Sequence, residues 1–285
     1  MSGNLLQSTQ VANINDGSSA PVIGDNGVIF YVESRAGAES SLVAVIDQGE
    51  DAELKWASNA LGVELPNAPS IGPDGNIYLN AWVEDQAISK FNAEDGSVMW
   101  SGGINTKVSN NTPAVDSEGN IYHGSRFQGA GRGGVFSWTL DGERRWEVTG
   151  VGAFYTAPVL SPDESTLYIL NTDEGLLYAL STANGAPKWD PVGTGSAIHG
   201  SSLSMAEGVI YYTTATHVVA ITDEGGSGSI KWQTQVNDAS NSGVVIGPNG
   251  ELYTSSRGGL LSLNLTDGSI IWTFDADVVE SVLSC

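Results

Sequence analysis

The sequence predicts an all-β protein built from repeated four-stranded units. Six tryptophans end similar stretches of sequence and recur 40 to 46 residues apart, at Trp56, Trp100, Trp146, Trp189, Trp232 and Trp272. Glycine supplies 36 of the 285 residues, while Val, Ile, Leu and aromatic residues remain plentiful, a mixture typical of short strands joined by tight turns. No segment keeps a helical apolar period beyond two turns, so we expect essentially no helix.

The first strand of each unit is short and apolar, and Ala-Pro or Thr-Pro often precedes it. The six segments read SSAPVIG, NAPSIG, NTPAVD, TAPVLS, GSSLSM and SGVVIG. Turns such as GDNG, GPDG, DSEG, SPDE and GPNG follow, and their oxygens are ligands that calcium prefers. Tight hairpins need the same residues for positive φ, so we interpret these segments as turns.

The second and third strands supply most of the predicted core. The second strand carries one aromatic residue in every unit, at Phe30, Tyr78, Tyr122, Tyr168, Tyr211 and Tyr253. The third strands read LVAVID, AISKFN, VFSWTL, LLYALS, VVAIT and LLSLNL, with alternating apolar residues. Trp138 replaces the inward leucines Leu180 and Leu263 of sister repeats, so we expect it in the core.

The fourth strand follows a turn and ends at the repeated tryptophan, as in AEDGSVMW, LDGERRW, TANGAPKW and TDGSIIW. We expect this tryptophan to pack across the neighbouring unit as a large apolar wedge. Four-stranded units of this length match the blades of a β-propeller.

We treat residues 1–285 as one propeller domain with six repeats. They span approximately residues 15–56, 65–100, 109–146, 154–189, 198–232 and 240–272. The terminal segments 1–14 and 273–285 are candidates for closing a six-bladed ring, which we favour. The alternative is part of a propeller with seven or eight blades.

The repeat resembles that of the quinoprotein (pyrroloquinoline quinone, PQQ) alcohol dehydrogenases, most closely in LLYALSTANGAPKW and LLSLNLTDGSIIW. The resemblance covers residues 15–275. The same repeat builds non-enzymatic relatives, among them the scaffold lipoprotein of outer-membrane assembly and sensor domains of bacterial kinases. The resemblance therefore implies the fold strongly and the function weakly.

Catalytic parts are mostly missing from the sequence. The quinoprotein dehydrogenases use a vicinal disulfide over the cofactor, which the single cysteine, Cys285, excludes. The three histidines, His123, His199 and His217, show no metal-ligand spacing. We expect no enzyme activity and no cofactor or metal. A quinone- or metal-binding oxidoreductase-like propeller, holding calcium or PQQ, is the alternative.

Charge and hydropathy restrict the partners. Eleven Lys and Arg against 33 Asp and Glu give a formal net charge of −22, which repels nucleic acid and anionic bilayers. No apolar stretch is long enough for a membrane helix, so we expect no membrane insertion. The N-terminal residues lack the pattern of a signal peptide, so the protein stays inside or has lost a leader; we favour a periplasmic, cell-surface or secreted location.

A binding site in a propeller of this kind forms on the rim of loops at one face. Four residues after the second-strand aromatics come Trp82, Arg126 and Arg257, where a framework position would repeat one residue type. Arginine suits carboxylates or sugar hydroxyls, and tryptophan offers a stacking face. The longest such loop adds Arg132. Connections leading into the first strands contribute Asn67, Asn111, Tyr155, His199 and Asn241.

The leading functional hypothesis is a non-catalytic binding or scaffold propeller whose rim recognises a protein segment or a glycan. Besides the oxidoreductase-like alternative, a third hypothesis is a structural fragment of a larger multi-repeat protein.

Overall fold

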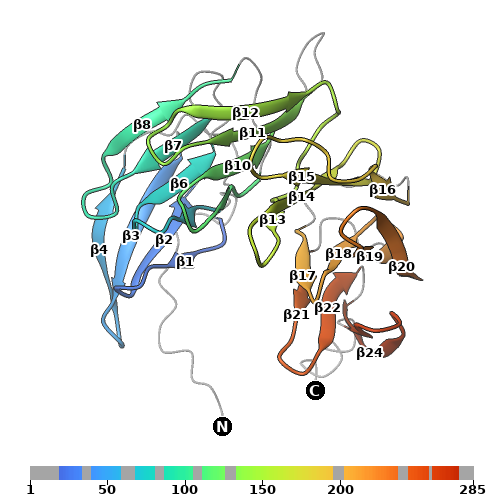
Figure 1. Cartoon of the computed structure of the whole chain (residues 1–285). Coiled ribbons are helices and arrows are strands. Elements are labelled where there is room, and N and C mark those ends of the chain that lie inside the picture. The colour runs from blue at the N-terminus through green and yellow to red at the C-terminus, as the bar shows by residue number, and fades with distance from the viewer. Residues whose placement is uncertain are drawn as a thin grey trace, which may run out of the picture. The chain divides into compact units, whose positions relative to one another are not determined.

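The computed structural model describes residues 19–33, 40–58, 68–80, 87–104, 111–125, 133–194, 202–236, 243–256 and 259–275. Over these residues the chain forms six four-stranded antiparallel sheets and no helix (Figure 1). Each sheet takes four strands that are consecutive in the sequence. The predictions of an all-β chain and of six four-stranded repeats are therefore confirmed.

The strands of the first three sheets have the following bounds. The first sheet contains β1 (Val22–Ile23), β2 (Val28–Glu33), β3 (Ser41–Asp47) and β4 (Ala52–Ala57). The second contains β5 (Ser70–Ile71), β6 (Ile77–Asn80), β7 (Ile88–Phe91) and β8 (Val98–Gly102). The third contains β9 (Ala114–Val115), β10 (Ile121–Gly124), β11 (Gly134–Trp138) and β12 (Arg144–Thr149).

The other three sheets follow the same order. The fourth contains β13 (Val159–Leu160), β14 (Thr166–Asn171), β15 (Leu176–Ser181) and β16 (Val192–Gly193). The fifth contains β17 (Ser204–Ala206), β18 (Val209–Thr213), β19 (His217–Asp223) and β20 (Gly228–Gln235). The sixth contains β21 (Val244–Ile246), β22 (Glu251–Ser256), β23 (Gly259–Asn264) and β24 (Ile270–Asp275).

The chain divides into two compact units, one of residues 1–121 and 138–144 and the other of residues 122–137 and 145–285. The division falls within the third sheet. The core of the first unit gathers second- and third-strand residues such as Phe30, Leu79 and Phe91. In the second unit, comparable clusters form between the fourth and fifth sheets and between the fifth and sixth.

The acidic segments between first and second strands are hairpin turns, as predicted. In the GPDG segment, Gly75 has a φ of 74°, and the Asp74 carboxylate accepts a hydrogen bond from the Asn76 amide at 3.2 Å. In the SPDE segment a glutamate, Glu164, takes the left-handed conformation with a φ of 56°. There the Asp163 carboxylate accepts from the Ser161 hydroxyl at 2.6 Å, which helps to hold a backbone that glycine would adopt more easily.

The fourth strand of the fourth sheet differs from the prediction. We expected it to end at Trp189, but β16 begins after that residue, and only an isolated bridge joins Leu180 to Pro187 before it. Pro187 has no N–H to donate to the ladder, so regular pairing cannot run through it. Trp189 is nonetheless 95% buried, with a relative exposure of 5%.

The repeated tryptophans pack within their own sheets. Each lies against the second-strand aromatic of the same sheet, with ring centroids 5.8 to 6.5 Å apart, in the pairs Phe30–Trp56, Tyr78–Trp100, Tyr122–Trp146, Tyr168–Trp189, Tyr211–Trp232 and Tyr253–Trp272. Such tilted contacts bury large apolar area.

Each of the first five tryptophans also meets the next sheet along the chain, at the turn between its third and fourth strands. Four indoles donate to backbone carbonyls of that turn at 2.8 to 3.0 Å, in the pairs Trp56–Ala93, Trp100–Leu140, Trp146–Thr182 and Trp232–Leu265. A turn glycine lies flat against the ring, and a Cβ on Gly268 would come within 2.4 Å of Trp232. The wedge prediction is therefore confirmed.

Trp138 is buried in the core, as expected, with a relative exposure of 4%. The Arg144 guanidinium lies 5.2 Å from its ring centroid, and the backbone of Gly102 packs against the ring. A glycine at that contact leaves room for an indole where the sister repeats have leucine.

Candidate functional site

The antiparallel order of the strands places the predicted rim residues at one edge of each sheet. Connections from the second to the third strand, and from the fourth strand to the next sheet, leave from the same edge of their sheet. We call this the loop edge. Seven predicted rim residues lie outside the described residues: Trp82, Arg126, Arg132, Arg257, Asn67, His199 and Asn241. The structure describes the other two, Asn111 and Tyr155.

Asn111 lies buried at the loop edge of the second sheet, with a relative exposure of 3%. The amide nitrogen of Asn80, the last residue of β6, donates to the Asn111 backbone carbonyl at 2.8 Å and to its side-chain oxygen at 2.7 Å. Asn111 therefore fastens the segment that leads into β9 to the end of β6. In this position the amide side chains satisfy polar groups at the end of a strand.

Tyr155 lies on a loop that the backbone holds firmly. This loop, residues 150–158, leads from β12 to β13, and we call it the 150–158 loop. The Phe154 amide donates to the Ser125 carbonyl at 3.2 Å, and the Asn171 side chain donates to the Val151 carbonyl at 2.7 Å. The loop is thus tied to the ends of second strands in both the third and the fourth sheets, and Tyr155 is partly exposed on it.

Phe154 anchors the same loop through its buried side chain. Its side chain is fully buried, its ring makes an edge contact with Tyr178 at 5.6 Å, and it packs on the backbone of Gly124. His123, next to Gly124, is also fully buried and stacks on Phe136 with centroids 5.5 Å apart. These aromatic contacts support the loop, so Tyr155 is presented from a packed base.

Thr172 shows what the aligned rim position does in the fourth sheet. It follows Tyr168 by four residues, as Trp82, Arg126 and Arg257 follow their aromatics. Thr172 is fully buried, and its backbone amide and its hydroxyl donate to the Ala153 carbonyl at 2.9 and 3.0 Å. In this sheet the position belongs to the framework that holds the 150–158 loop.

Sequence reasoning missed the residues that hold this loop. Gly152 has a φ of 111°, and a Cβ there would lie 2.4 Å from the Asn171 amide nitrogen. Only glycine allows Asn171 to approach the loop this closely. The pair of glycines at 150 and 152, immediately before Phe154, is the sequence signal that could have indicated a tightly bound loop.

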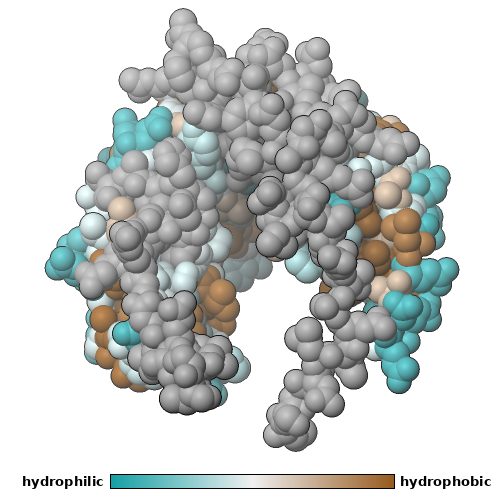
Figure 2. All heavy atoms as spheres, turned by 180° about the vertical axis from the view of Figure 1, so that it is seen from behind, coloured by the Kyte–Doolittle hydropathy of each residue, from teal (hydrophilic) through white to brown (hydrophobic). Residues whose placement is uncertain are grey.

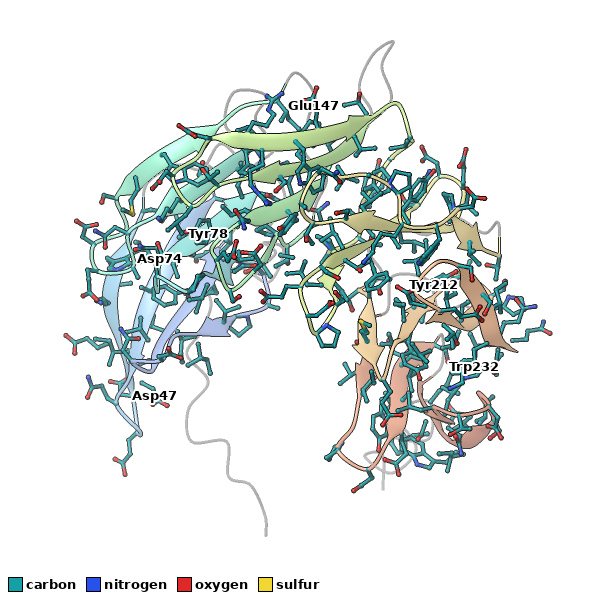
Figure 3. The ribbon with its side chains drawn as sticks, viewed as in Figure 1. Asp47, Asp74, Tyr78, Glu147, Tyr212 and Trp232 are labelled. Atoms are coloured by element: carbon teal, nitrogen blue, oxygen red, sulfur yellow. The ribbon has the colours of Figure 1, made fainter. Side chains whose placement is uncertain are left out.

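A second polar cluster lies in the first unit, at the edge opposite the loop edge. Lys90 is almost fully buried, and its ammonium lies 2.7 Å from the Asp74 carboxylate. Asp74 lies near Tyr78, whose hydroxyl donates to it at 3.3 Å (Figure 3). Burial raises the pKa of Asp74, but hydrogen bonds with Lys90 and Asn76 outweigh it and hold the pKa below its ordinary value. Asp74 is therefore an ionised partner of Lys90.

This cluster borders a cavity of about 320 Å³, lined mainly by turns of the first and second sheets, including Asp25, Asp74 and Glu94. Lys55 pairs with Glu94 at 2.8 Å beside it. Among the described residues, no group of three His, Cys, Asp or Glu side chains is arranged to hold a metal ion. Within the described ranges, no helix is long and apolar enough to cross a membrane.

Known relatives match much of the chain. Over 211 residues it is 25% identical to the outer membrane protein assembly factor BamB of Moranella endobia, which covers 65% of this chain and 52% of that protein. Over 163 residues it is 26% identical to the serine/threonine-protein kinase AfsK of Streptomyces griseus, which covers 53% of this chain and 20% of the kinase. The chain thus spans about half the length of the first relative and a fifth of the second.

Solved structures show the same fold. BamB from Moraxella catarrhalis superposes with a TM-score of 0.65 at 17% identity, over 92% of this chain and 73% of that one. A catalytically inactive virginiamycin B lyase from Staphylococcus aureus with quinupristin gives 0.68 at 13% identity, over 94% and 87%. Sqt1 from Saccharomyces cerevisiae gives 0.71 at 14% identity, over 90% and 73%. The fold class is that of a β-propeller.

A family model described as outer membrane protein assembly factor BamB matches residues 84–227. This match covers half of the chain and includes two complete tryptophan repeats, most of a third and the end of a fourth, in keeping with the resemblance to PQQ-like repeats seen in the sequence. The chain therefore belongs to the PQQ-like β-propeller family of outer membrane protein assembly factor BamB.

Proposed function

We propose that this chain is a non-catalytic scaffold that binds a protein segment at its loop edge. The observation that carries the proposal is the 150–158 loop, where backbone bonds to two sheets hold a partly exposed tyrosine. A loop that is already ordered loses little entropy when it binds. Membership of the family of outer membrane protein assembly factor BamB supports a protein segment as the ligand rather than a glycan.

Tyr155 suits this role chemically. A tyrosine offers an aromatic face and a hydroxyl at a low cost in side-chain entropy, which explains why tyrosine is common in binding surfaces. Trp82, Arg126, Arg132 and Arg257, which lie outside the described residues, would add stacking and carboxylate recognition from the connections between second and third strands. Asn67, His199 and Asn241 would make further polar contacts with the bound segment.

The proposed location is extracytoplasmic, in the periplasm, on the cell surface or in the medium. The relative named as an outer membrane protein assembly factor supports it. The lyase and the kinase do not indicate an activity for this chain. The lyase is only 13% identical, which supports a common fold alone, and the chain spans a fifth of the kinase.

Site-specific photo-crosslinking tests the proposal. We would replace Tyr155 with benzoylphenylalanine, irradiate cells that produce the protein, and identify the adducts by mass spectrometry. The same substitution at Ile230, a 42% exposed residue of β20, is the matched control. We expect discrete protein adducts at position 155 that are absent at position 230. Carbohydrate adducts, or the same adducts at both positions, would contradict the proposal.

The oxidoreductase-like alternative is tested by melting the protein with calcium and PQQ. A ligand that binds only the folded state raises the apparent stability, by about 2.7 kcal/mol at a hundredfold excess over its Kd. We expect the melting temperature to stay unchanged with either addition or both. A rise that saturates with PQQ would favour the oxidoreductase-like propeller instead.

A further inference from the structure

Three Asn-Gly pairs occur in the sequence, and each lies in a tight turn of the described structure. They are Asn26-Gly27 after β1, Asn184-Gly185 after β15 and Asn249-Gly250 after β21. All three glycines have positive φ, between 74° and 80°. An asparagine before glycine is open to spontaneous deamidation, because glycine has no side chain to hinder attack by its own amide nitrogen.

Deamidation at such a pair needs only water. The glycine amide nitrogen loses its proton and attacks the side-chain carbonyl carbon of the asparagine, so that an N–C bond forms and ammonia leaves. Water then opens the succinimide ring at one of its two carbonyls and gives aspartate or isoaspartate. The backbone must rotate for this attack, so the glycine amide must first leave its hydrogen bond in the turn.

The turn of Asn26 fixes the asparagine side chain. The Asn26 side-chain oxygen accepts a hydrogen bond from the Val28 amide at 3.1 Å, and the Gly27 amide donates to the Gly24 carbonyl at 2.8 Å. Nothing lies within 4 Å of a Cβ built on Gly27, so the turn is otherwise open. Two hydrogen bonds must therefore break before Asn26 can react.

The turn of Asn184 is restrained further. Its side-chain oxygen accepts from the Ala186 amide at 3.0 Å, and the Gly185 amide donates to the Ser181 carbonyl at 2.8 Å. A Cβ built on Gly185 would lie 2.7 Å from the Trp146 ring, so this glycine is packed beneath an indole. The backbone around Asn184 cannot rotate without losing that packing as well.

The turn of Asn249 lacks the restraint on the side chain. Asn249 is exposed, and its side chain makes no hydrogen bond to any part of the chain that the structure describes. The Gly250 amide donates to the Gly247 carbonyl at 3.2 Å, the longest of the three corresponding contacts. Nothing lies within 4 Å of a Cβ built on Gly250. Only one long hydrogen bond therefore opposes the rotation.

We propose that Asn249 is the site at which this chain deamidates first, ahead of Asn26 and then Asn184. Hydrophilic side chains lie among apolar ones on the surface of the described parts of the chain (Figure 2). Asn26 is exposed like Asn249, although its turn borders the second sheet, so exposure alone does not separate the two. The hydrogen bonds that separate them lie inside each turn and do not involve neighbouring sheets.

The modification changes the turn between β21 and β22 and leaves the proposed binding surface intact. Either product replaces a neutral amide with a carboxylate, and isoaspartate also adds a methylene group to the backbone. The Gly247 amide donates to the Glu251 carbonyl at 2.9 Å across this turn, so a longer backbone loosens the β21–β22 pairing. The turn lies at the edge opposite the loop edge, away from Tyr155.

Incubating the whole chain in ¹⁸O-labelled water at mildly alkaline pH tests the proposal. Ring opening incorporates the label, and mass spectrometry of proteolytic peptides measures it at all three pairs in one sample. We expect the label to appear several times faster at Asn249 than at Asn26, and slowest at Asn184. In concentrated urea the three rates should converge, because the turn contacts are lost.

Two results would overturn the proposal. One is labelling of Asn26 or Asn184 at least as fast as Asn249 in the folded chain. The other is the same order of rates in urea, which would assign the difference to the local sequence instead of the turns. Asn249→Gln is the matched variant, and circular dichroism melting checks its fold. It should lose the fast phase and keep the rates at the other two pairs, whereas a fast phase that persists would also contradict the assignment.

Discussion

The fifth and sixth sheets carry the same tryptophan motif in different surroundings. Trp232 is 8% exposed, donates to the Leu265 carbonyl at 3.0 Å and lies against Gly268 between the two sheets (Figure 3). Trp272, one repeat later, keeps the contact with its second-strand tyrosine but is 42% exposed. The motif therefore fixes how the indole sits in its own sheet, while the following sheet decides whether it is buried.

Truncating the two tryptophans gives the largest difference. Trp232→Ala removes a buried indole and leaves a cavity between packed sheets, so we expect it to lower the free energy of unfolding by about 3–5 kcal/mol. Trp272→Ala should cost about 1 kcal/mol or less, because the side chain is already 42% exposed and its removal leaves no cavity between packed sheets. Urea unfolding followed by circular dichroism measures both. Equal losses would show that Trp272 is covered in solution.

Adding a methyl group beneath Trp232 is expected to have the next largest effect. Gly268 has a φ of 72°, and its Cβ would come within 2.4 Å of the indole, so Gly268→Ala combines backbone strain with overpacking. We expect a loss of about 2–4 kcal/mol. Gly250→Ala is the control, because its φ of 80° is similar and nothing lies within 4 Å of the added atom. It should cost about 1–2 kcal/mol. Equal losses for the two variants would show that the contact between Gly268 and the indole does not contribute to the cost of the substitution.

The second-strand tyrosines sharpen the comparison on a smaller scale. Tyr168 donates to Asp223 of the next sheet, so Tyr168→Phe should cost about 1–2 kcal/mol. The Tyr253 hydroxyl makes a long 3.4 Å contact with Glu251 of its own strand, and Tyr253→Phe should change stability by about 0.5 kcal/mol or less. Thermal melting at low protein concentration distinguishes them. A larger loss at Tyr253 than at Tyr168 would reverse the expected order.

The smallest effect is a pH dependence in the turn that covers Trp232. Hydrogen bonds from the Ser269 hydroxyl and amide lower the pKa of Asp267 below its ordinary value of 3.8. The ionised carboxylate therefore adds stability above about pH 4, and this stability is lost as the pH falls through the lowered pKa. Asp267→Asn keeps the acceptor oxygen without the titration, so its melting temperature should fall less between pH 4 and 2.5. Parallel acid profiles for the two proteins would contradict this assignment.

Much of the fold could be predicted from the sequence because the repeat supplies the same local signals six times. The third strand read as LLYALS is β15, Leu176–Ser181, residue for residue. The prediction that a fourth strand ends at Trp189 was wrong. Pro187 has no N–H to donate to the ladder, and the tryptophan pattern does not reveal this loss. Alternation identifies a strand, but a single imino acid inside the motif decides whether the strand can pair.

The candidate site was less predictable. Asn111 and Tyr155 were selected by one alignment rule, yet the structure buries Asn111 against Asn80 and leaves Tyr155 partly exposed on a clamped loop. Gly152 and Asn171 hold this loop in place. One lies in the loop and the other at the end of β14, and no repeated sequence spacing connects them. Contacts between segments that are distant in sequence leave no periodic signal.

The sequence by itself determined the all-β class, the six repeats, the tight turns and the place of each tryptophan at the end of its unit, because these depend on local periodicity and on residues such as glycine that permit positive φ. Only the tertiary structure decided which tryptophans are buried, which turn covers each of them and which rim residues belong to the framework. The physical reason is that burial depends on the neighbouring sheet. An identical indole is 8% exposed at Trp232 and 42% exposed at Trp272, where the described residues supply the contact with Tyr253 but no covering turn.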